Sequence, residues 1–383
     1  MTAPGPREPI ELDALPELLT PLRRWAADHG DVVRFTTTDG GEGYSITSPE
    51  LAEHVLRRNA RNYVRGHGVD RVRLLVRGGM LVAEGEAWLR HRALARPLFQ
   101  RDALAGIVDR IRGEAVATAG AWAAASGTAI DVTAGTSAFA LRCIVHGLLG
   151  VRDAGPLGEL ANDAARDLGF ARRFRALRPI VGAMIDRGEV SGDGTRDELV
   201  DHVLTLVLAG HETTASTLVW IWTLLAAHPA VEARLHAELA AGPVGLPFLD
   251  RVIAEALRLY PAVWLLTRRA LGPDRFGDVE VAAGAQVFVP LYLVLRHPAH
   301  WPDPDAFDPD RFLDPAPRHP LAYAPFGVGP RSCVGEHLAR LELREHVAAV
   351  AARVALRPTA PVELDPQINL RPRGPVTMTV RAR

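Results

Sequence analysis

The chain has 383 residues and a formal net charge of -1, with 48% hydrophobic and 23% charged residues. This balance is typical of a globular protein, and a chain of this length can enclose a sizeable ligand. A charge so close to zero gives no global field that would attract nucleic acid or an anionic membrane, so neither partner is expected. We expect one domain over residues 1–383, because the motifs below are spread along most of the chain.

The chain has two cysteines, which cannot form a tetrahedral cysteine site or a disulfide framework. Its opening, MTAPGPREPI, lacks the basic start and apolar run of a secretory signal. The most apolar region, around LVLAG and LVWIWTLLAA, is interrupted by His211 and Glu212, which argues against a membrane span. These features favour a soluble protein in the reducing cytoplasm.

The expected elements are mainly helices, with a few short strands. ELLTPLRRWAADHG predicts a helix that ends at Gly30, and VVRFTT and GYSIT alternate like paired strands. Helical spacing of apolar residues follows in GEAWLRHRALARPLF, in residues 103–125 and in VTAGTSAFALRCIVHGLLG. One long helix is predicted from Thr195 to about His228, apolar on several faces and therefore central to the fold. Pro229 then opens a new helix.

The last third of the chain mixes short elements with an irregular segment. EALRLY predicts a helix and VFVP a strand, and residues 301–320 form a Pro/Asp-rich meander with little regular structure. A long irregular segment inside a compact domain usually has a specific function.

The two cysteines stand in different contexts. Cys143 lies on a helix face in ALRCIVHG, where a cysteine usually acts as a small buried hydrophobe. Cys333 lies in FGVGPRSCVG, residues 326–335. If a helix begins there, its unpaired N–H groups and positive dipole end would favour thiolate over thiol. A thiolate is suited to bind a metal or attack an electrophile.

The residues around Cys333 indicate what the thiolate would bind. Glycines at 327, 329 and 335 would let the backbone lie flat against a bulky partner and adopt positive φ. Phe326 could shield the sulfur, and Arg331 offers a forked donor for a carboxylate. Together these features describe a haem with a cysteine axial ligand. An enzyme with a nucleophilic cysteine is the alternative, although this loop marks no base for it.

FGVGPRSCVG resembles the cysteine-ligand loop of the cytochrome P450 family, the haem-thiolate monooxygenases. It matches the pattern F-G-x-G-x-R-x-C-x-G at each fixed position. The resemblance implies the cytochrome P450 fold, mainly α with small β-sheets, and haem b with Cys333 as the iron ligand. It also implies that Phe326, Gly327, Arg331 and Gly335 contact the haem.

LAGHETTAS, residues 208–216, lies in the middle of the long helix. The Thr213 hydroxyl can bond to the Ala209 carbonyl, which would loosen the helix locally and open a groove, and the adjacent Glu212 could relay protons. A bend with a satisfied buried threonine is the alternative. A zinc-protease motif is excluded, because the position four after His211 is alanine.

The resemblance makes this segment the oxygen-binding helix that crosses the distal haem face. It implies that Thr213 positions the proton for O–O cleavage and that Glu212 supplies the relay. Ala209 and Gly210 would lie at the haem and leave room over the iron.

The resemblance also explains several charged residues. Glu255 and Arg258 in EALR lie one helical turn apart, and with Arg311 of FDPDRF they match a structural set that holds the haem loop.

Haem propionates need cationic partners. Trp88 and Arg92 in WLRHR match the family's propionate contact, and so does Arg268 in LLTRRA. Arg269 should point away on the opposite strand face.

Six residues resemble the family's substrate contacts and predict a hydrophobic substrate: Met80, Leu81, Val263, Trp264, Ile368 and Asn369. Each residue alone is better explained as part of the core, and only the set supports the substrate prediction. Residues 150–195 provide only about 45 positions where the family builds two long helices and a loop, so the lid (F–G) region should be abridged. The pocket would then accept a large or carrier-tethered substrate or be covered by another protein. A degenerate site is the third alternative, and the intact Cys333, Glu212 and Thr213 argue against it.

The sequence therefore predicts a cytoplasmic monooxygenase that inserts one oxygen atom from O2 into a hydrophobic natural-product-like substrate, in secondary metabolism. Electrons would come from a separate ferredoxin or flavodoxin-type partner that docks near Cys333, where Arg331 and Arg340 lie. Oxidative coupling or desaturation is an alternative outcome, and a haem-thiolate sensor is an alternative class.

Overall fold

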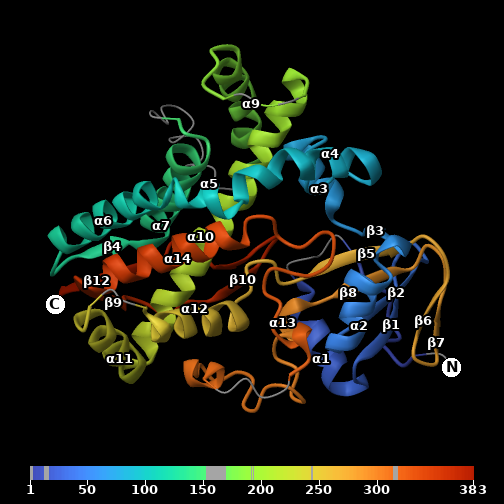
Figure 1. Cartoon of the computed structure of the whole chain (residues 1–383). Coiled ribbons are helices and arrows are strands. Elements are labelled where there is room, and N and C mark those ends of the chain that lie inside the picture. The colour runs from blue at the N-terminus through green and yellow to red at the C-terminus, as the bar shows by residue number, and fades with distance from the viewer. Residues whose placement is uncertain are drawn as a thin grey trace. The chain divides into compact units, whose positions relative to one another are not determined.

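The computed structural model describes residues 3–12, 17–151, 170–190, 192, 194–242, 245–313 and 318–383 (Figure 1). These residues fall into two compact units. Unit 1 comprises residues 1–71, 257–333 and 365–370, and unit 2 comprises residues 72–256, 334–364 and 371–383, apart from the undescribed positions. The single domain over residues 1–383 stays a prediction.

Unit 1 is built on a five-stranded sheet with the order β1-β2-β8-β5-β3. Its strands are β1 (Val32–Thr36), β2 (Glu42–Ile46), β3 (Tyr63–Arg65), β5 (Leu266–Ala270) and β8 (Gln286–Val289). β2 and β8 are parallel and the other neighbours are antiparallel, so N-terminal strands (blue) lie beside strands near residue 280 (orange) in Figure 1.

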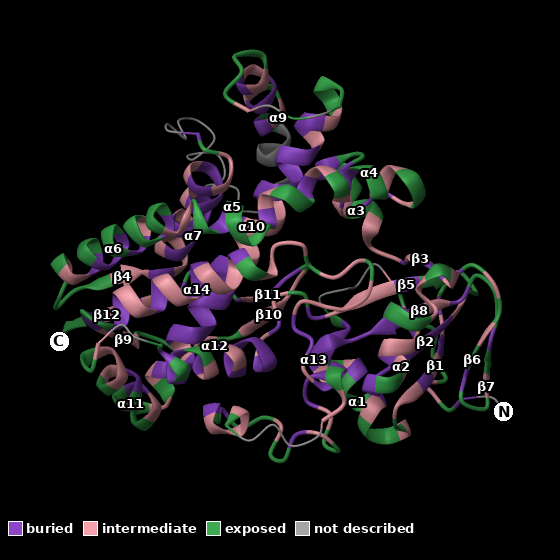
Figure 2. Cartoon of the chain, viewed as in Figure 1, coloured by how far each residue is buried: buried purple, intermediate pink, exposed green. Residues whose placement is uncertain are grey.

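The sheet places alternate residues in a hydrophobic core that includes Ile46, Val287 and Val289, all 0% exposed. Figure 2 shows buried residues along these strands and along α13. The remaining elements of unit 1 are α1 (Leu19–His29), α2 (Pro49–Glu53), the π-helix η2 (His54–Arg58), η3 (Ala60–Asn62), β6 (Asp274–Phe276), β7 (Val279–Val281), α13 (Leu291–Val294) and the 3-10 turns η6 (Pro309–Phe312) and η7 (Pro320–Ala322).

Unit 2 is helical and is organised around α10 (Arg196–Ala227), which packs against α7, α9 and α14. Its other helices are α4 (Gly85–Ala95), η4 (Arg96–Phe99), α5 (Arg101–Ala105), α6 (Val108–Ala124), α7 (Val132–Arg142), the π-helix η5 (Cys143–Leu148), α9 (Phe170–Asp186), α11 (Pro229–Ala240) and α14 (Glu336–Ala351). A small sheet has the order β4-β12-β9, from β4 (Ala129–Asp131), β9 (Val354–Pro358) and β12 (Thr377–Ala382).

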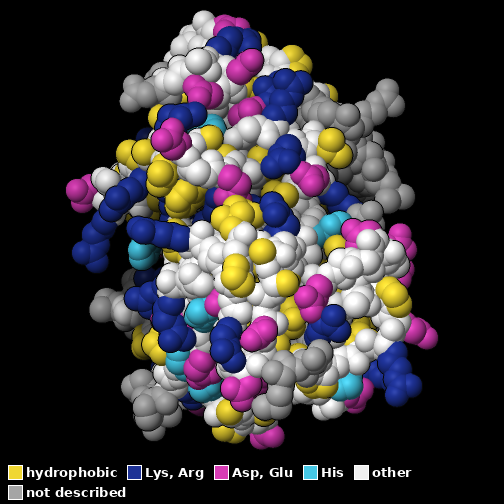
Figure 3. Space-filling model, turned by 90° about the vertical axis from the view of Figure 1, so that its right-hand side faces the viewer, with side chains coloured by type: hydrophobic (Ala, Val, Ile, Leu, Met, Phe, Trp, Pro, Cys, Tyr) yellow, Lys and Arg dark blue, Asp and Glu magenta, His cyan; other side chains and the backbone are white. Residues whose placement is uncertain are grey.

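Four elements cross the boundary between the units along the chain: α3 (Val69–Val76), α12 (Pro247–Leu259), and the paired strands β10 (Leu364–Pro366) and β11 (Leu370–Pro372). In the described part of the chain no single helix is long and apolar enough to span a membrane, although α10 and α11, bent by 108° at their junction, pass that test as a pair. On the face drawn in Figure 3, arginines and acidic side chains are interspersed.

Several sequence predictions are confirmed by these elements. The first helix ends at His29 with Gly30 as its C-cap, and β1 and β2 pair as expected. The long helix runs from Arg196 to Ala227, because a capping box of Thr195 and Glu198 satisfies its first N–H groups and Pro229 opens α11.

The predicted helix start at Cys333 is wrong. α14 begins at Glu336, and its N-cap residue is Gly335, which has no side chain to cap the first N–H groups. Cys333 thus precedes the helix by three positions, and a dipole acts only over the first turn of a helix. The prediction of an abridged lid covers residues 150–195, of which residues 152–169, 191 and 193 lie outside the described part of the chain and residues 170–186 form α9.

Candidate functional site

The loop around Cys333 is a closed turn within unit 1. The Cys333 N–H donates to the Phe326 carbonyl over 2.9 Å, and the Ser332 N–H donates to the Gly329 carbonyl over 3.1 Å. The thiol is exposed at the end of this turn. Because backbone hydrogen bonds fix the loop at both ends, the sulfur is presented by a defined backbone rather than by a free segment.

Gly329 is required by two features of this loop. Its φ is +77°, which side-chain-bearing residues rarely adopt, and a Cβ there would lie 2.0 Å from the Leu56 carbonyl oxygen of η2. Gly327 also has a positive φ, of +68°, whereas Gly335 has a φ of -91° and does not match the expected positive value. The loop is therefore seated directly on the backbone of η2.

The strand β5 separates two adjacent arginines. Arg268 is 7% exposed and Arg269 is exposed, as expected for opposite faces of a strand. One Arg268 Nη donates to the Thr267 carbonyl over 2.8 Å. The contact of Arg268 with a haem propionate stays a prediction.

The meander of unit 1 is held by arginines that donate to backbone carbonyls. Arg258 is 0% exposed and donates to Leu295, Pro304 and Ala306 over 3.2, 2.7 and 3.1 Å. Arg311 donates to Ala306 as well, over 3.3 Å.

Both guanidinium groups also lie over the ring of the buried Trp301, at 5.0 and 5.8 Å from its centroid. Glu255 on α12 is likewise 0% exposed. The complete burial of Glu255 and Arg258 argues against a solvated surface pair, and the structural role of these two residues with the partly exposed Arg311 stays a prediction.

In unit 2, α10 has a partly exposed window in its middle. Residues 202–207 and 214–222 are buried, whereas residues 208–210, 212 and 213 are partly exposed. The Thr213 hydroxyl donates to the Ala209 carbonyl over 2.6 Å, which confirms that predicted bond. The helix nevertheless continues through this point as regular α-helix, so the predicted loosening is not seen.

Two further contacts near this window could not be read from the sequence. Glu212 Oε1 lies 3.6 Å from Nη1 of Arg371, on β11. A Cβ at Gly210 would lie 2.5 Å from Cδ1 of Ile144 on η5. The small residue at 210 therefore serves helix packing. Neither contact has a local sequence signal, because each joins positions far apart in the chain.

The remaining predicted haem residues of unit 2 lie on α4. Trp88 and Arg92 are partly exposed and one helical turn apart, and the Trp88 backbone N–H donates to the Glu84 carbonyl over 3.3 Å. Two partly exposed side chains at this spacing lie on the same face of the helix, as the prediction requires.

The predicted substrate residues differ in exposure. Val263 and Ile368 are 36% and 53% exposed, and Leu81 is partly exposed, whereas Met80 and Asn369 are buried. Trp264 is 1% exposed and its indole N–H donates to the Gln367 carbonyl over 2.7 Å. Core packing therefore accounts for Trp264.

A cavity of about 870 Å³ in unit 1 contains none of the predicted site residues. It is lined by Glu42, His54, Pro273, Asp274, Arg275, Glu280, Val281 and Ala282.

Two buried polar pairs support α10 beneath the window. Thr214 donates to Glu342 Oε2 over 2.9 Å, and Ser137 Oγ lies 2.6 Å from His211 Nε2. Burial raises the pKa of Glu342 to about 8 and lowers the pKa of His211 to about 4. Both groups are therefore neutral near pH 7, which lets them lie inside a helical core.

Glu342→Gln should change how stability depends on pH. The folded chain holds a proton on Glu342 up to about pH 8, whereas the unfolded carboxyl releases it above its ordinary pKa of 4.5. The wild-type chain should therefore lose stability between these pH values relative to the variant, by about 1 to 3 kcal/mol. Glutamine keeps an acceptor for Thr214 and does not ionise. Urea unfolding of both proteins at pH 5.5, 7 and 8 measures the difference, and parallel profiles would contradict the buried neutral acid.

Comparisons with known proteins identify the family of this chain. A family model described as Cytochrome P450 matches residues 178–360. Cyclooctatin synthase from Streptomyces melanosporofaciens is 31% identical over 92% of this chain and 87% of its own length. Cyclooctat-9-en-7-ol 5-monooxygenase from the same organism is 30% identical over 86% of this chain and 83% of its own length. The crystal structure of a 6-coordinated cytochrome P450 from Thermus thermophilus has a TM-score of 0.81 at 28% identity, covering 98% of this chain and 99% of that chain.

The mainly helical fold with small sheets, the matching family model and a relative named as a monooxygenase define the class of this protein as a monooxygenase. The chain belongs to the cytochrome P450 family. Membership implies a haem cofactor, a hydrophobic substrate and a redox partner.

Proposed function

We propose that this chain binds haem b with Cys333 as the axial ligand and inserts one oxygen atom from O2 into a hydrophobic natural-product-like substrate. Electrons come from a separate ferredoxin or flavodoxin-type partner, and the protein works in the cytoplasm without nucleic acid or membrane. The observation that supports this most strongly is the exposed Cys333 thiol on a loop fixed by backbone hydrogen bonds and positive-φ glycines.

The residues predicted to hold haem are chemically suited to it. A thiolate is the axial ligand that favours O–O cleavage, and Gly327 and Gly329 add no side chains to the loop that carries Cys333. Arg268, with Trp88 and Arg92, would hold the propionates, and Phe326, Arg331, Gly335, Ala209 and Gly210 would contact the ring. When bound, haem supplies the redox chemistry that activates O2.

The residues of the α10 window supply protons. Glu212 takes up a proton from solvent and releases it beside Thr213, while Arg371 holds the Glu212 carboxylate. The Thr213 hydroxyl hydrogen is directed at the Ala209 carbonyl, so its oxygen is available to accept a hydrogen bond from the group that carries the proton. A group that holds and passes a proton at a fixed position is a general acid–base catalyst.

The substrate class is proposed from the side chains and from the relatives. Val263, Leu81 and Ile368 offer apolar exposed surface, and one relative is named as a monooxygenase of cyclooctat-9-en-7-ol. We propose a substrate with a comparable hydrocarbon skeleton, free or tethered to a carrier, bound also through Met80 and Asn369.

The absorption spectrum of the purified, dithionite-reduced protein with and without carbon monoxide tests the proposal. A far red-shifted Soret band is expected, because only a thiolate ligand produces that electronic environment at the iron. A band typical of histidine or neutral-thiol ligation would remove Cys333 from its role. If the purified protein binds no haem, the alternative hypothesis of an enzyme with a nucleophilic cysteine is favoured.

The two cysteines should differ in reactivity with a maleimide. Burial raises the pKa of the Cys143 thiol, whose side chain is 0% exposed, whereas Cys333 is exposed. Haem-free folded protein should therefore label at Cys333 alone, and loading with haem should protect it by about tenfold or more in rate. Peptide mass spectrometry assigns the labelled residue. Labelling of Cys333 that haem does not slow would contradict its role as the ligand.

A further inference from the structure

Asp201 on α10 joins two segments of unit 2 that are far apart in the sequence. Its Oδ1 forms an ion pair with Nη2 of Arg178 on α9, and its Oδ2 accepts the Gly78 N–H over 3.0 Å. The two side chains of the pair are only 13% and 19% exposed. A single carboxylate thus holds one helix and one loop at the same time.

The loop held by Asp201 lies directly against α10. A Cβ at Gly79 would be 2.0 Å from the Thr205 hydroxyl oxygen and 3.0 Å from the Asp201 carbonyl oxygen. The Thr205 hydroxyl donates to that same carbonyl over 2.7 Å. Glycine is therefore the residue that allows the close approach, and the Gly78 bond to Asp201 sets the position of the loop along the helix.

The next residues of this loop are the predicted substrate contacts Met80 and Leu81. The Val82 and Ala83 N–H groups both donate to the Gly79 carbonyl over 3.0 Å, so residues 79–83 form a compact turn. A compact turn moves as a rigid unit, so its position depends on the contacts that hold Gly78 and Gly79. The Gly79 N–H donates to the Val76 carbonyl over 2.8 Å within the chain, and the Gly78 bond to Asp201 ties this end of the loop to α10.

We propose that Asp201 is a positioning residue that couples α9 to the loop of residues 78–83. Arg178 neutralises and orients the carboxylate, so that Oδ2 stays directed at the Gly78 N–H. Removal of the Arg178 charge on α9 then loosens the loop of residues 78–83, although that loop does not contact Arg178 through this pair. The consequence for substrate binding rests on the proposed function, whereas the coupling itself does not.

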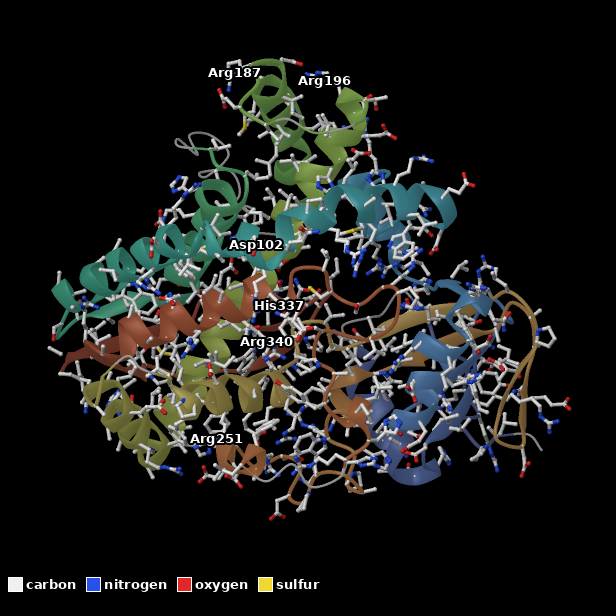
Figure 4. All side chains as sticks on the ribbon, viewed as in Figure 1. Asp102, Arg187, Arg196, Arg251, His337 and Arg340 are labelled. Atoms are coloured by element: carbon white, nitrogen blue, oxygen red, sulfur yellow. The ribbon has the colours of Figure 1, made fainter. Side chains whose placement is uncertain are left out.

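The chain contains a matched control between the same two helices. Arg196 at the start of α10 binds Asp186 at the end of α9 through two bonds, of 2.6 and 2.7 Å, and both side chains are about half exposed. Figure 4 labels Arg196 and the neighbouring Arg187 at this end of α9. This pair joins α9 to α10 at a point away from Asp201. A variant that breaks it should loosen α9 while leaving the Arg178–Asp201 ion pair intact.

Hydrogen exchange of the haem-loaded protein, read by mass spectrometry, tests the coupling. Arg178→Met leaves the Asp201 carboxylate in place, yet it should raise exchange about tenfold in residues 77–83 as well as in residues 176–186. Asp186→Asn should raise exchange in residues 176–186 alone. Arg178→Lys should restore protection of the loop, because the charge is retained.

The result that overturns the proposal is loop exchange in Arg178→Met equal to that of the wild-type chain. Equal loop exchange in Arg178→Met and Asp186→Asn would overturn it too, since any loosening of α9 would then be sufficient. The reduced carbon monoxide spectrum of each variant shows separately whether the haem site is intact, so failure of the proposed function is distinguished from failure of the coupling.

For binding, 4-phenylimidazole is the probe, followed through the Soret band. Arg178→Met should weaken its affinity about tenfold relative to Asp186→Asn, and Arg178→Lys should restore it. Equal affinities in the two variants would show that Asp201 does not position the substrate loop.

Discussion

Thr213→Ala should divert reductant from product to peroxide, lowering the fraction of electrons that end in product by about tenfold or more. The physical reason is the loss of the hydroxyl that positions the proton, and a positioned general acid or base contributes about 10² to 10⁴ in rate. The Thr213 oxygen lies at a partly exposed point of an otherwise buried helix, next to Glu212. Reductant consumption, product and peroxide, measured together with the substrate found by spin-state titration, give this fraction.

Thr217 provides a matched control for this experiment. Its hydroxyl makes the same type of bond one turn later, to the Thr213 carbonyl over 2.9 Å, but it is 3% exposed. Thr217→Ala should therefore leave the product fraction unchanged, and Thr213→Ser should keep it, because serine retains the hydroxyl. An unchanged fraction in Thr213→Ala would remove Thr213 from proton delivery.

Local features were predictable where the physical cause is local. The spacing of apolar residues and the capping residues Thr195 and Pro229 set the limits of the long helix. The Thr213 bond to Ala209 follows from the geometry of one helical turn. The opposite exposure of Arg268 and Arg269 follows from the alternation of a strand.

Contacts between distant segments were not predictable from the sequence. The pairs Glu212–Arg371 and Thr214–Glu342 join positions 159 and 128 residues apart, and only the tertiary fold brings them together. Gly210 was predicted to leave space at the haem, but its small size is also required by Ile144 of η5. The helix start was misplaced because the residues between Cys333 and Glu336 form turns instead of the first helical turn.

Gly329→Ala should destabilise the protein by about 2 to 6 kcal/mol and reduce haem loading. Two costs combine: a non-glycine residue at φ +77° costs about 1 to 3 kcal/mol, and forcing a methyl group into packed backbone costs about 1 to 3 kcal/mol more. The atom in the way is the Leu56 carbonyl oxygen, which belongs to the backbone of η2 and cannot rotate aside as a side chain would.

Gly277→Ala separates the two costs. Gly277, between β6 and β7, has a φ of +62° and no atom within 4 Å of the place where its methyl group would lie, so only the backbone cost, about 1 kcal/mol, applies. The midpoint temperature of thermal unfolding and the ratio of haem to protein should both fall in Gly329→Ala. Gly277→Ala should keep its haem. If the two variants behave alike, the contact between the cysteine loop and η2 does not hold the loop. If Gly329→Ala unfolds earlier but loads haem fully, the contact serves stability alone, and the position of Cys333 is set by the hydrogen bond from its N–H to the Phe326 carbonyl.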